Sequence, residues 1–146
     1  MIPSLKIEVT QEAEPETRAL IARRLQEFNA PYLGNYPFGT LDVYVRNTDG
    51  KVVGGLVGEF ASGWFSIHVL WIVENLRGSG LGTTILQAAE NAAVKNGCHG
   101  AILETMSFQA PLFYQKRGYV RVGVVDDYPG GAQKMFMRKV LLADGG

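Results

Sequence analysis

The segment from Leu76 to Leu86, LRGSGLGTTIL, constrains the fold of this chain more than any other part of the sequence. It follows an apolar run at residues 64–73 and leads into a helical pattern at about 83–96. A strand that enters a helix through glycines leaves main-chain N–H groups free at the positive end of the helix dipole. The segment therefore predicts a strand–loop–helix unit that binds a phosphate or diphosphate, with Arg77 adding a charge beside Gly78, Gly80 and Gly82.

Two well-known phosphate-binding loops do not fit this segment. A dinucleotide-binding loop needs G-x-G-x-x-G, and the position of the third glycine is occupied by Thr83. A nucleoside-triphosphatase loop ends in G-K-[S/T], and this segment contains no lysine. The pattern that remains is R-x-x-G-x-G, from Arg77 to Gly82.

Hydrophobic periodicity and turn signals predict the elements on either side of the loop. Strands are expected at Leu5–Thr10, Leu41–Arg46, Val52–Phe60, Trp64–Val73, His99–Thr105, Tyr119–Val125 and Gln133–Leu142. Helices are expected at Glu14–Phe28, Thr83–Asn96 and Gln109–Arg117, and a loop at Asn29–Thr40. The order predicts one mixed α/β domain over residues 1–146, whose middle strand–helix–strand unit is a right-handed parallel crossover.

Composition excludes several classes of function. The formal net charge of the 146 residues is zero, so no global basic field exists to bind nucleic acid. Cys98 is the only cysteine, and the chain has only two histidines, so we expect neither a disulfide nor a metal site. Without a signal-peptide pattern at the start or a membrane-spanning apolar run, the sequence predicts a cytoplasmic protein that does not contact membranes.

A second motif follows downstream, in the segment SFQAPLFYQKRGYVRVG (residues 107–123). The segment contains, in order, Ala110, the pair Phe113-Tyr114 and the pair Gly118-Tyr119. Together with R-x-x-G-x-G, this order resembles the GNAT superfamily of N-acetyltransferases. The spacing between the motifs leaves room for one helix and one strand, and the resemblance covers residues 41–142. It implies a single GNAT-like α/β (α+β) domain, with a central, mostly antiparallel sheet that contains a splayed parallel strand pair and is flanked by helices.

The resemblance implies an enzyme that moves an acetyl group from acetyl-CoA to a primary amine of a small molecule or peptide, by direct attack in a ternary complex. The CoA diphosphate would bind the loop, and the pantetheine arm would pair with the end of the preceding strand. The residues implied for cofactor binding are Trp71, Ile72, Val73, Arg77, Gly78, Ser79, Gly80, Leu81, Gly82, Thr83, Ser107 and Tyr114.

Tyr114 is implied as the catalytic residue that donates a proton to the departing sulfur. Ser107 stands where many members have asparagine; we interpret it as a helix cap and leave its contact with the cofactor open. Glu74 is the predicted general base, with Glu104, His68 or a water molecule as alternatives. A lone histidine in an apolar strand is typically a core residue, so His68 is also expected to be buried in the core.

The acceptor is expected opposite the CoA, at Tyr32, Tyr36, Asp127 and Tyr128. Aromatic side chains with a few carboxylates favour a small amine with an apolar body, and Asp126 and Asp127 are also expected to shape a turn. Two alternatives stay open: a non-catalytic acyl-CoA sensor, and an acetyltransferase acting on aminoacyl-tRNA. The last strands also predict a possible homodimer.

Overall fold

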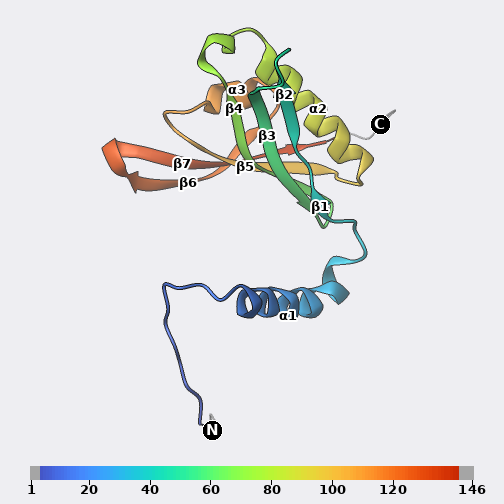
Figure 1. Cartoon of the computed structure of the whole chain (residues 1–146), viewed down its shortest axis with the longest axis vertical. Helices are drawn as coiled ribbons and strands as arrows, with labels where there is room; N and C mark the ends of the chain where they lie inside the picture. The colour runs from blue at the N-terminus through green and yellow to red at the C-terminus, as the bar shows by residue number, and fades with distance from the viewer. Residues whose placement is uncertain (1–3, 142–146) are drawn as a thin grey trace. The chain divides into compact units, whose positions relative to one another are not determined.

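The computed structural model describes residues 4–141 and divides the chain into two units, Met1–Asn35 and Tyr36–Gly146, whose structures are given separately. The first unit contains one helix, α1 (Pro15–Leu33), drawn in blue in Figure 1. The helix starts with Pro15 in its first turn, where a missing N–H costs nothing. It ends before Gly34, whose φ of 77° breaks the helical path.

Two predictions for the first unit were wrong. Leu5–Thr10 forms no strand, and no strand pair of the sheet includes it. An alternating sequence becomes a strand only where a neighbouring strand supplies hydrogen-bond partners. The helix also continues past Phe28 to Leu33, so the predicted loop starts five residues too early. Pro31 lies within the last turn of the helix, where its missing N–H removes one main-chain hydrogen bond.

The second unit is built on one seven-stranded sheet with the order β1-β3-β4-β5-β7-β6, in which β2 also pairs with β3 (Figure 1). The strands are β1 (Gly39–Thr40), β2 (Val43–Arg46), β3 (Val52–Ala61), β4 (Trp64–Ile72), β5 (Gly100–Met106), β6 (Val120–Tyr128) and β7 (Ala132–Val140). β4 and β5 pair in parallel, and every other pair is antiparallel. The predicted mixed, mostly antiparallel sheet with one parallel pair is confirmed.

Local turn chemistry explains how the chain reverses between strands. Ser62 and Gly63 both have positive φ, 54° and 82°, which is the geometry of a tight two-residue hairpin between β3 and β4. Before β3, the side-chain oxygen of Asn47 accepts hydrogen bonds from the N–H groups of Asp49 and Lys51.

The boundaries of the elements differ from the prediction by a few residues: β6, for example, extends to Tyr128. The predicted end of the last strand at Leu142 lies outside the described residues.

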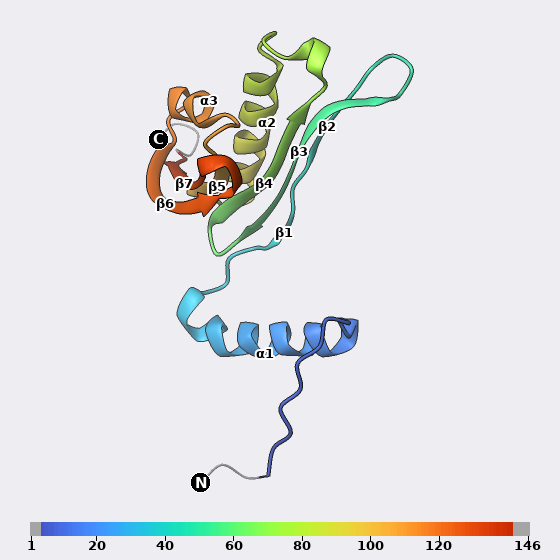
Figure 2. The same ribbon diagram turned by 90° about the vertical axis from the view of Figure 1, so that its left-hand side faces the viewer.

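Two helices complete the second unit, α2 (Leu81–Lys95) and α3 (Pro111–Lys116), with short 3-10 turns η1 (Glu74–Leu76) and η2 (Pro129–Gly131). Figure 2 shows α2 lying alongside β2, β3 and β4, with α3 beside it. Helices and strands share one core, in which the following side chains are almost completely buried: Leu56, Phe65, Ile85, Leu86, Tyr119 and Met137.

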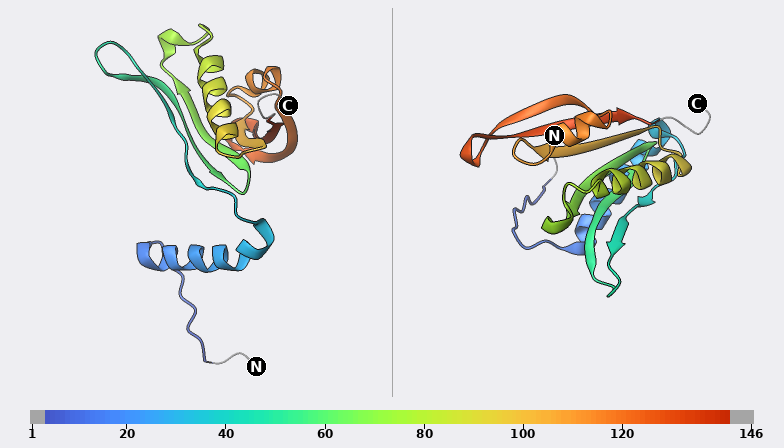
Figure 3. Two further views of the ribbon diagram at one scale, coloured as in Figure 1. Left: turned by 90° about the vertical axis from the view of Figure 1, so that its right-hand side faces the viewer. Right: turned by 90° about the horizontal axis from the view of Figure 1, so that it is seen from above.

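The parallel pair holds together only at one end. β4 and β5 are in register from Trp64 opposite Gly100 to Ile67 opposite Leu103, and beyond this point the strands separate. Figure 3 shows the half formed by β5, β6 and β7 turning away from the half formed by β2, β3 and β4. The splayed pair expected from the sequence is therefore present, and it opens toward the loop that follows β4.

Candidate active site

The opening between β4 and β5 is a cavity of about 660 Å³. Its lining comes from the free ends of both strands, the loop after β4, the first turn of α2, and α3. The lining residues are Ile67, His68, Val69, Leu70, Ile72, Arg77, Gly78, Gly80, Gly82, Thr83, Leu103, Glu104, Thr105, Gln109, Ala110, Phe113, Tyr114 and Arg117. The volume lies in the range of small-molecule and cofactor sites.

A bulge in β4 marks the point where the strands part. Val57 and Gly58 of β3 face Val69 and Ile67 of β4, so His68 is the extra residue. Farther along, the N–H of Val73 donates to the carbonyl of Val53. Because main-chain groups alternate in direction along a strand, Leu70 and Ile72 direct theirs into the opening.

Trp71, Ile72 and Val73 were the strand residues predicted to pair with the pantetheine arm. Of these three, only Ile72 directs its main-chain groups toward the opening. Trp71 pairs with Gly55 and Val73 bonds to Val53, so the main-chain groups of both face β3. Leu70 was missed, because the sequence does not show which residues of a strand face its neighbour. Only the register with β3, fixed by the bulge, reveals this.

The loop after β4 presents a row of free amides. Gly78 and Gly80 have φ values of 78° and 88°, which a glycine adopts without strain, and an added Cβ at either position would meet no atom within 4 Å. Among the described residues, no acceptor lies within hydrogen-bond reach of the amides of residues 78–83. Since α2 begins at Leu81, these amides lie at the positive end of its dipole, and the arrangement suits an anion.

The other loop residues have supporting roles. The Nε of Arg77 donates to the carbonyl of Ile72 at 2.9 Å, which ties the loop to the end of β4. The hydroxyl of Ser79 donates to the carbonyl of Leu76 at 2.6 Å. Gly82 differs from the other two glycines, because a Cβ there would approach the Phe113 ring to 3.2 Å. It permits close packing of α2 against α3, and Leu81 packs on the core.

Tyr114 is buried on α3, with 7% of its surface exposed, and it lines the cavity. Its ring makes edge contacts with Phe113 and Tyr119, at centroid distances of 5.2 and 5.7 Å. No hydrogen bond joins its hydroxyl to another of the described residues. Burial raises the pKa of Tyr114 to about 12, so the phenol keeps its proton at neutral pH and remains a donor.

The side chains considered as general bases lie in different places. Glu104 and His68 both line the cavity. Glu104 pairs with Lys134 at 3.3 Å, and the Nε2 of His68 lies 3.6 Å from Glu59. The expectation that His68 is a core residue was wrong, because the bulge turns it to the surface. Glu74 lies in η1, is exposed and is not part of the cavity lining.

Ser107 does not cap α3, and that prediction was wrong. The N-cap of α3 is Ala110, without a side-chain cap. The Ser107 hydroxyl instead accepts the N–H of Gln133 at 3.0 Å, and the Ser107 N–H donates to the carbonyl of Gln133 at 2.8 Å. Ser107 thereby fastens the end of β5 to the start of β7, away from the cavity lining.

Within the second unit, the residues expected to bind the acceptor do not come together as one group. Tyr36 lies near His99, at a ring distance of 6.3 Å, at the opposite end of β4 from the glycine loop. Asp127 and Tyr128 lie at the end of β6, where a bulge gives Asp127 a φ of 65° and where they line a shallow depression with Asp126. Tyr32 belongs to the first unit.

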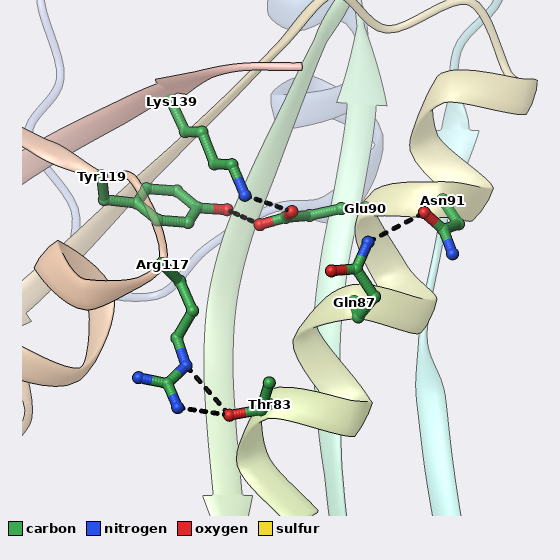
Figure 4. Close-up of polar contacts among 7 residues, drawn as sticks. All are labelled: Thr83, Gln87, Glu90, Asn91, Arg117, Tyr119 and Lys139. Atoms are coloured by element: carbon green, nitrogen blue, oxygen red, sulfur yellow. Dashed lines mark hydrogen bonds and ion pairs between the residues drawn. The ribbon is translucent and has the colours of Figure 1, made fainter. Parts of the chain in front are cut away.

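A buried polar network holds α2 against the strands behind the cavity (Figure 4). Glu90 of α2 is 4% exposed, and its two oxygens accept the Tyr119 hydroxyl at 2.8 Å and the Lys139 ammonium at 2.7 Å. Burial, followed by the charge of Glu90, raises the pKa of Tyr119. Because both carboxylate oxygens are satisfied, the charge is tolerated in the core.

The sequence also gave no signal for several other lining residues. Phe113 was noted as part of a motif, but its contact with Gly82 was not expected, and neither Gln109 nor Thr105 was considered. Arg117 is one of these: it bridges α3 to Thr83 of α2. Such residues meet only in the folded chain, and their spacing along the sequence follows no pattern.

A mixed sheet whose one parallel strand pair splays beside a helix start with free amides is the arrangement of an acyl-transferring domain, and comparisons with known proteins agree. The family model for the acetyltransferase (GNAT) domain matches residues 39–121. Blasticidin-S acetyltransferase of Streptomyces morookaense is 36% identical over 91% of this chain and 93% of its own length. An acetyltransferase of Agrobacterium fabrum is 32% identical over 87% of this chain and 93% of its own.

Solved structures give the same result. An acetyltransferase from Bacillus cereus superposes with a TM-score of 0.81 at 31% identity, covering 92% of this chain and 98% of its own. A protein from Agrobacterium tumefaciens superposes with a TM-score of 0.85 at 30% identity, covering 93% and 99%. The chain therefore belongs to the GNAT family of acetyltransferases, as the two sequence motifs indicated.

Two further observations concern membranes and metals. No helix within residues 4–141 has the length and apolar composition needed to cross a membrane. In the same part of the chain, no three His, Cys, Asp or Glu side chains are grouped as metal ligands would be.

Proposed function

We propose that this acetyltransferase uses acetyl-CoA to acetylate a primary amine of a small molecule. The observation that carries the proposal is that one cavity joins the free amides at the start of α2 to the hydroxyl of Tyr114. The amides suit a diphosphate, and the phenol suits a leaving group that needs a proton. Bound acetyl-CoA would supply the activated acetyl group as a thioester.

The residues of this chain divide the work as follows. The amides of residues 78–83 and Arg77 bind the diphosphate. Leu70 would offer its main-chain groups to the pantetheine arm, in the manner of an added strand, and Ile72 would offer its N–H, because its carbonyl already accepts Arg77. One of these N–H groups would stabilise a developing negative charge on oxygen. Tyr114 holds a proton at its hydroxyl oxygen for the sulfur.

The acceptor amine must lose a proton to react, because an alkylamine has a pKa near ~10.4. Glu104 and His68 lie in the cavity and are favoured over Glu74 as the group that accepts this proton, directly or through water. The acceptor itself would approach from the side of Asp127 and Tyr128, with Tyr32 and Tyr36 retained as weaker proposals. The protein is proposed to act in the cytoplasm without a metal and with a homodimer as a possible assembly.

A small-molecule amine is favoured over a peptide because the curated relative with 36% identity is named for blasticidin S. The test is release of free CoA from acetyl-CoA with a panel of amines: blasticidin S, short polyamines, lysine peptides and aminoacyl-tRNA. We expect amine-dependent release with at least one small molecule. Binding of acetyl-CoA without release for any amine would instead identify a sensor, and release with aminoacyl-tRNA alone would identify a tRNA-directed enzyme; either result refutes the proposal.

A further inference from the structure

Arg117, which no sequence motif marks, lies beside the anion-binding loop. It is half-buried at the end of α3 and lines the same cavity as Arg77, Gly78 and Gly80. Its Nε and one terminal nitrogen donate to the hydroxyl of Thr83 in the first turn of α2, as Figure 4 shows. Its guanidinium carbon also lies 4.2 Å from the centre of the Phe113 ring.

These contacts orient the guanidinium but do not neutralise its charge. The third donation goes to the main-chain carbonyl of Phe113 at 3.2 Å, so of the five N–H groups of an arginine, three bonds are made. All the acceptors are neutral, and no carboxylate of the described residues forms an ion pair with Arg117. The remaining donors and the full positive charge stay available at the cavity.

The position of the Arg117 guanidinium is electrostatically unfavourable unless an anion binds beside it. A cation is disfavoured beside a helix start, because the helix dipole is positive there. Arg77 adds a second cation to the same cavity. Among the described lining residues the one carboxylate is Glu104, and it is already paired with Lys134. The cavity thus concentrates more positive charge than loop amides alone would provide.

We propose that Arg117 is a second phosphate-binding residue, which contacts a phosphoryl group of CoA beside the α2 loop. The inference rests on the proposed use of acetyl-CoA. Thr83 and Phe113 hold the fork of the guanidinium in place before the ligand arrives, so little side-chain entropy is lost on binding. The chemistry fits either the diphosphate or the 3′-phosphate of CoA, and both are phosphoryl oxygens suited to an arginine fork.

The test is calorimetric titration of the full chain with CoA, 3′-dephospho-CoA and pantetheine, for the wild type and Arg117→Gln. Lys116→Gln is the matched control: it removes the same charge from the neighbouring residue, which is exposed and outside the cavity lining. Circular dichroism confirms that each variant is folded. A lost charge-assisted contact is expected to weaken CoA binding by about 10-fold or more in Arg117→Gln, and by less than about 2-fold in Lys116→Gln.

Comparing CoA with 3′-dephospho-CoA shows whether Arg117 contacts the diphosphate or the 3′-phosphate. An equal loss for CoA and 3′-dephospho-CoA assigns Arg117 to the diphosphate, and a loss for CoA alone assigns it to the 3′-phosphate; either outcome supports the proposal. Unchanged CoA binding in Arg117→Gln overturns it, as does an equal loss for pantetheine, which has no phosphate. If wild-type protein fails to bind CoA at all, the proposed function fails first, so the two failures are separable.

Discussion

The end of the cavity at the start of α2 is made of main-chain amides, whereas the end at Tyr114 is made of side chains. The first depends on backbone geometry: φ values near 80° at Gly78 and Gly80 and a helix that begins at Leu81. The second depends on burial, which raises the pKa of Tyr114 to about 12. The first end is suited to binding and the second to chemistry, so changes at the two ends should affect different kinetic constants.

Gly80→Val alters the amide end of the cavity, and we expect it to have the largest effect. A β-branched residue cannot hold a φ of 88° without strain, so the loop must move and the amides lose their alignment. CoA affinity is expected to fall by about 100-fold, from the loss of more than one charge-assisted hydrogen bond. Isothermal titration calorimetry with CoA measures this directly.

Gly130→Val is the matched control for that change. Gly130 has a φ of 73° and, like Gly80, no atom within 4 Å of an added Cβ, but it lies in the turn between β6 and β7. The strain is similar and Gly130 does not line the cavity, so CoA affinity should stay close to that of the wild type. Equal losses in the two variants would show that general destabilisation, not the free amides, explains the result.

Tyr114→Phe alters the side-chain end of the cavity. Removing the phenol hydroxyl takes away the proposed proton donor and leaves the ring packed between Phe113 and Tyr119. We expect kcat to fall by about 10-fold or more while the Kd for CoA changes little. Steady-state kinetics with the best amine of the panel, together with calorimetry, separates the two constants. Unchanged turnover would remove Tyr114 from the mechanism.

Ser107→Ala should affect neither end of the cavity. The hydroxyl of Ser107 accepts the Gln133 N–H at 3.0 Å, so its loss should lower the free energy of unfolding by about 1 kcal/mol. Urea denaturation measures the change, and calorimetry should find CoA affinity unaltered. A several-fold loss of CoA affinity at normal stability would instead place Ser107 at the cofactor.

The pH dependence gives the smallest expected effect. Because burial raises the pKa of Tyr114 from 10.0 to about 12, the phenol stays protonated in the folded enzyme throughout the neutral and mildly alkaline range. The ratio of kcat between the wild type and Tyr114→Phe should therefore be constant from about pH 7 to about pH 10. A ratio that falls toward one well below pH 10 would mean that the phenol loses its proton much earlier than burial implies.

The two ends also differ in how far the sequence predicts them. The residues from Arg77 to Gly82 are contiguous, so their glycines and positive charge form a motif that the sequence shows directly. The strand–helix–strand unit around this loop was also predicted correctly. Leu70, Glu104 and Arg117 reach the cavity from separate elements, and their roles depend on strand register and on the bulge at His68. The spacing of residues along the chain does not predict strand register or the position of a bulge.

The failed predictions have related causes. Ser107 precedes α3 as a cap would, but its hydroxyl bonds to a residue 26 positions away in the sequence. Leu5–Thr10 alternates as a strand would, but forms none because pairing, not alternation, makes a strand. His68 sits in an apolar run, yet a one-residue bulge turns it outward. In each case the structure depends on contacts between residues far apart in the sequence, which were present for Ser107 and His68 and missing for Leu5–Thr10.

The most direct test of the account is a two-dimensional amide NMR titration of the protein with CoA and, separately, with pantetheine. The account predicts that the amide signals of residues 78–83 shift most with CoA, saturate with the Kd found by calorimetry, and barely move with pantetheine. If CoA binds and these six amides stay in place while others shift, the glycine loop is not the diphosphate site and the central claim is wrong.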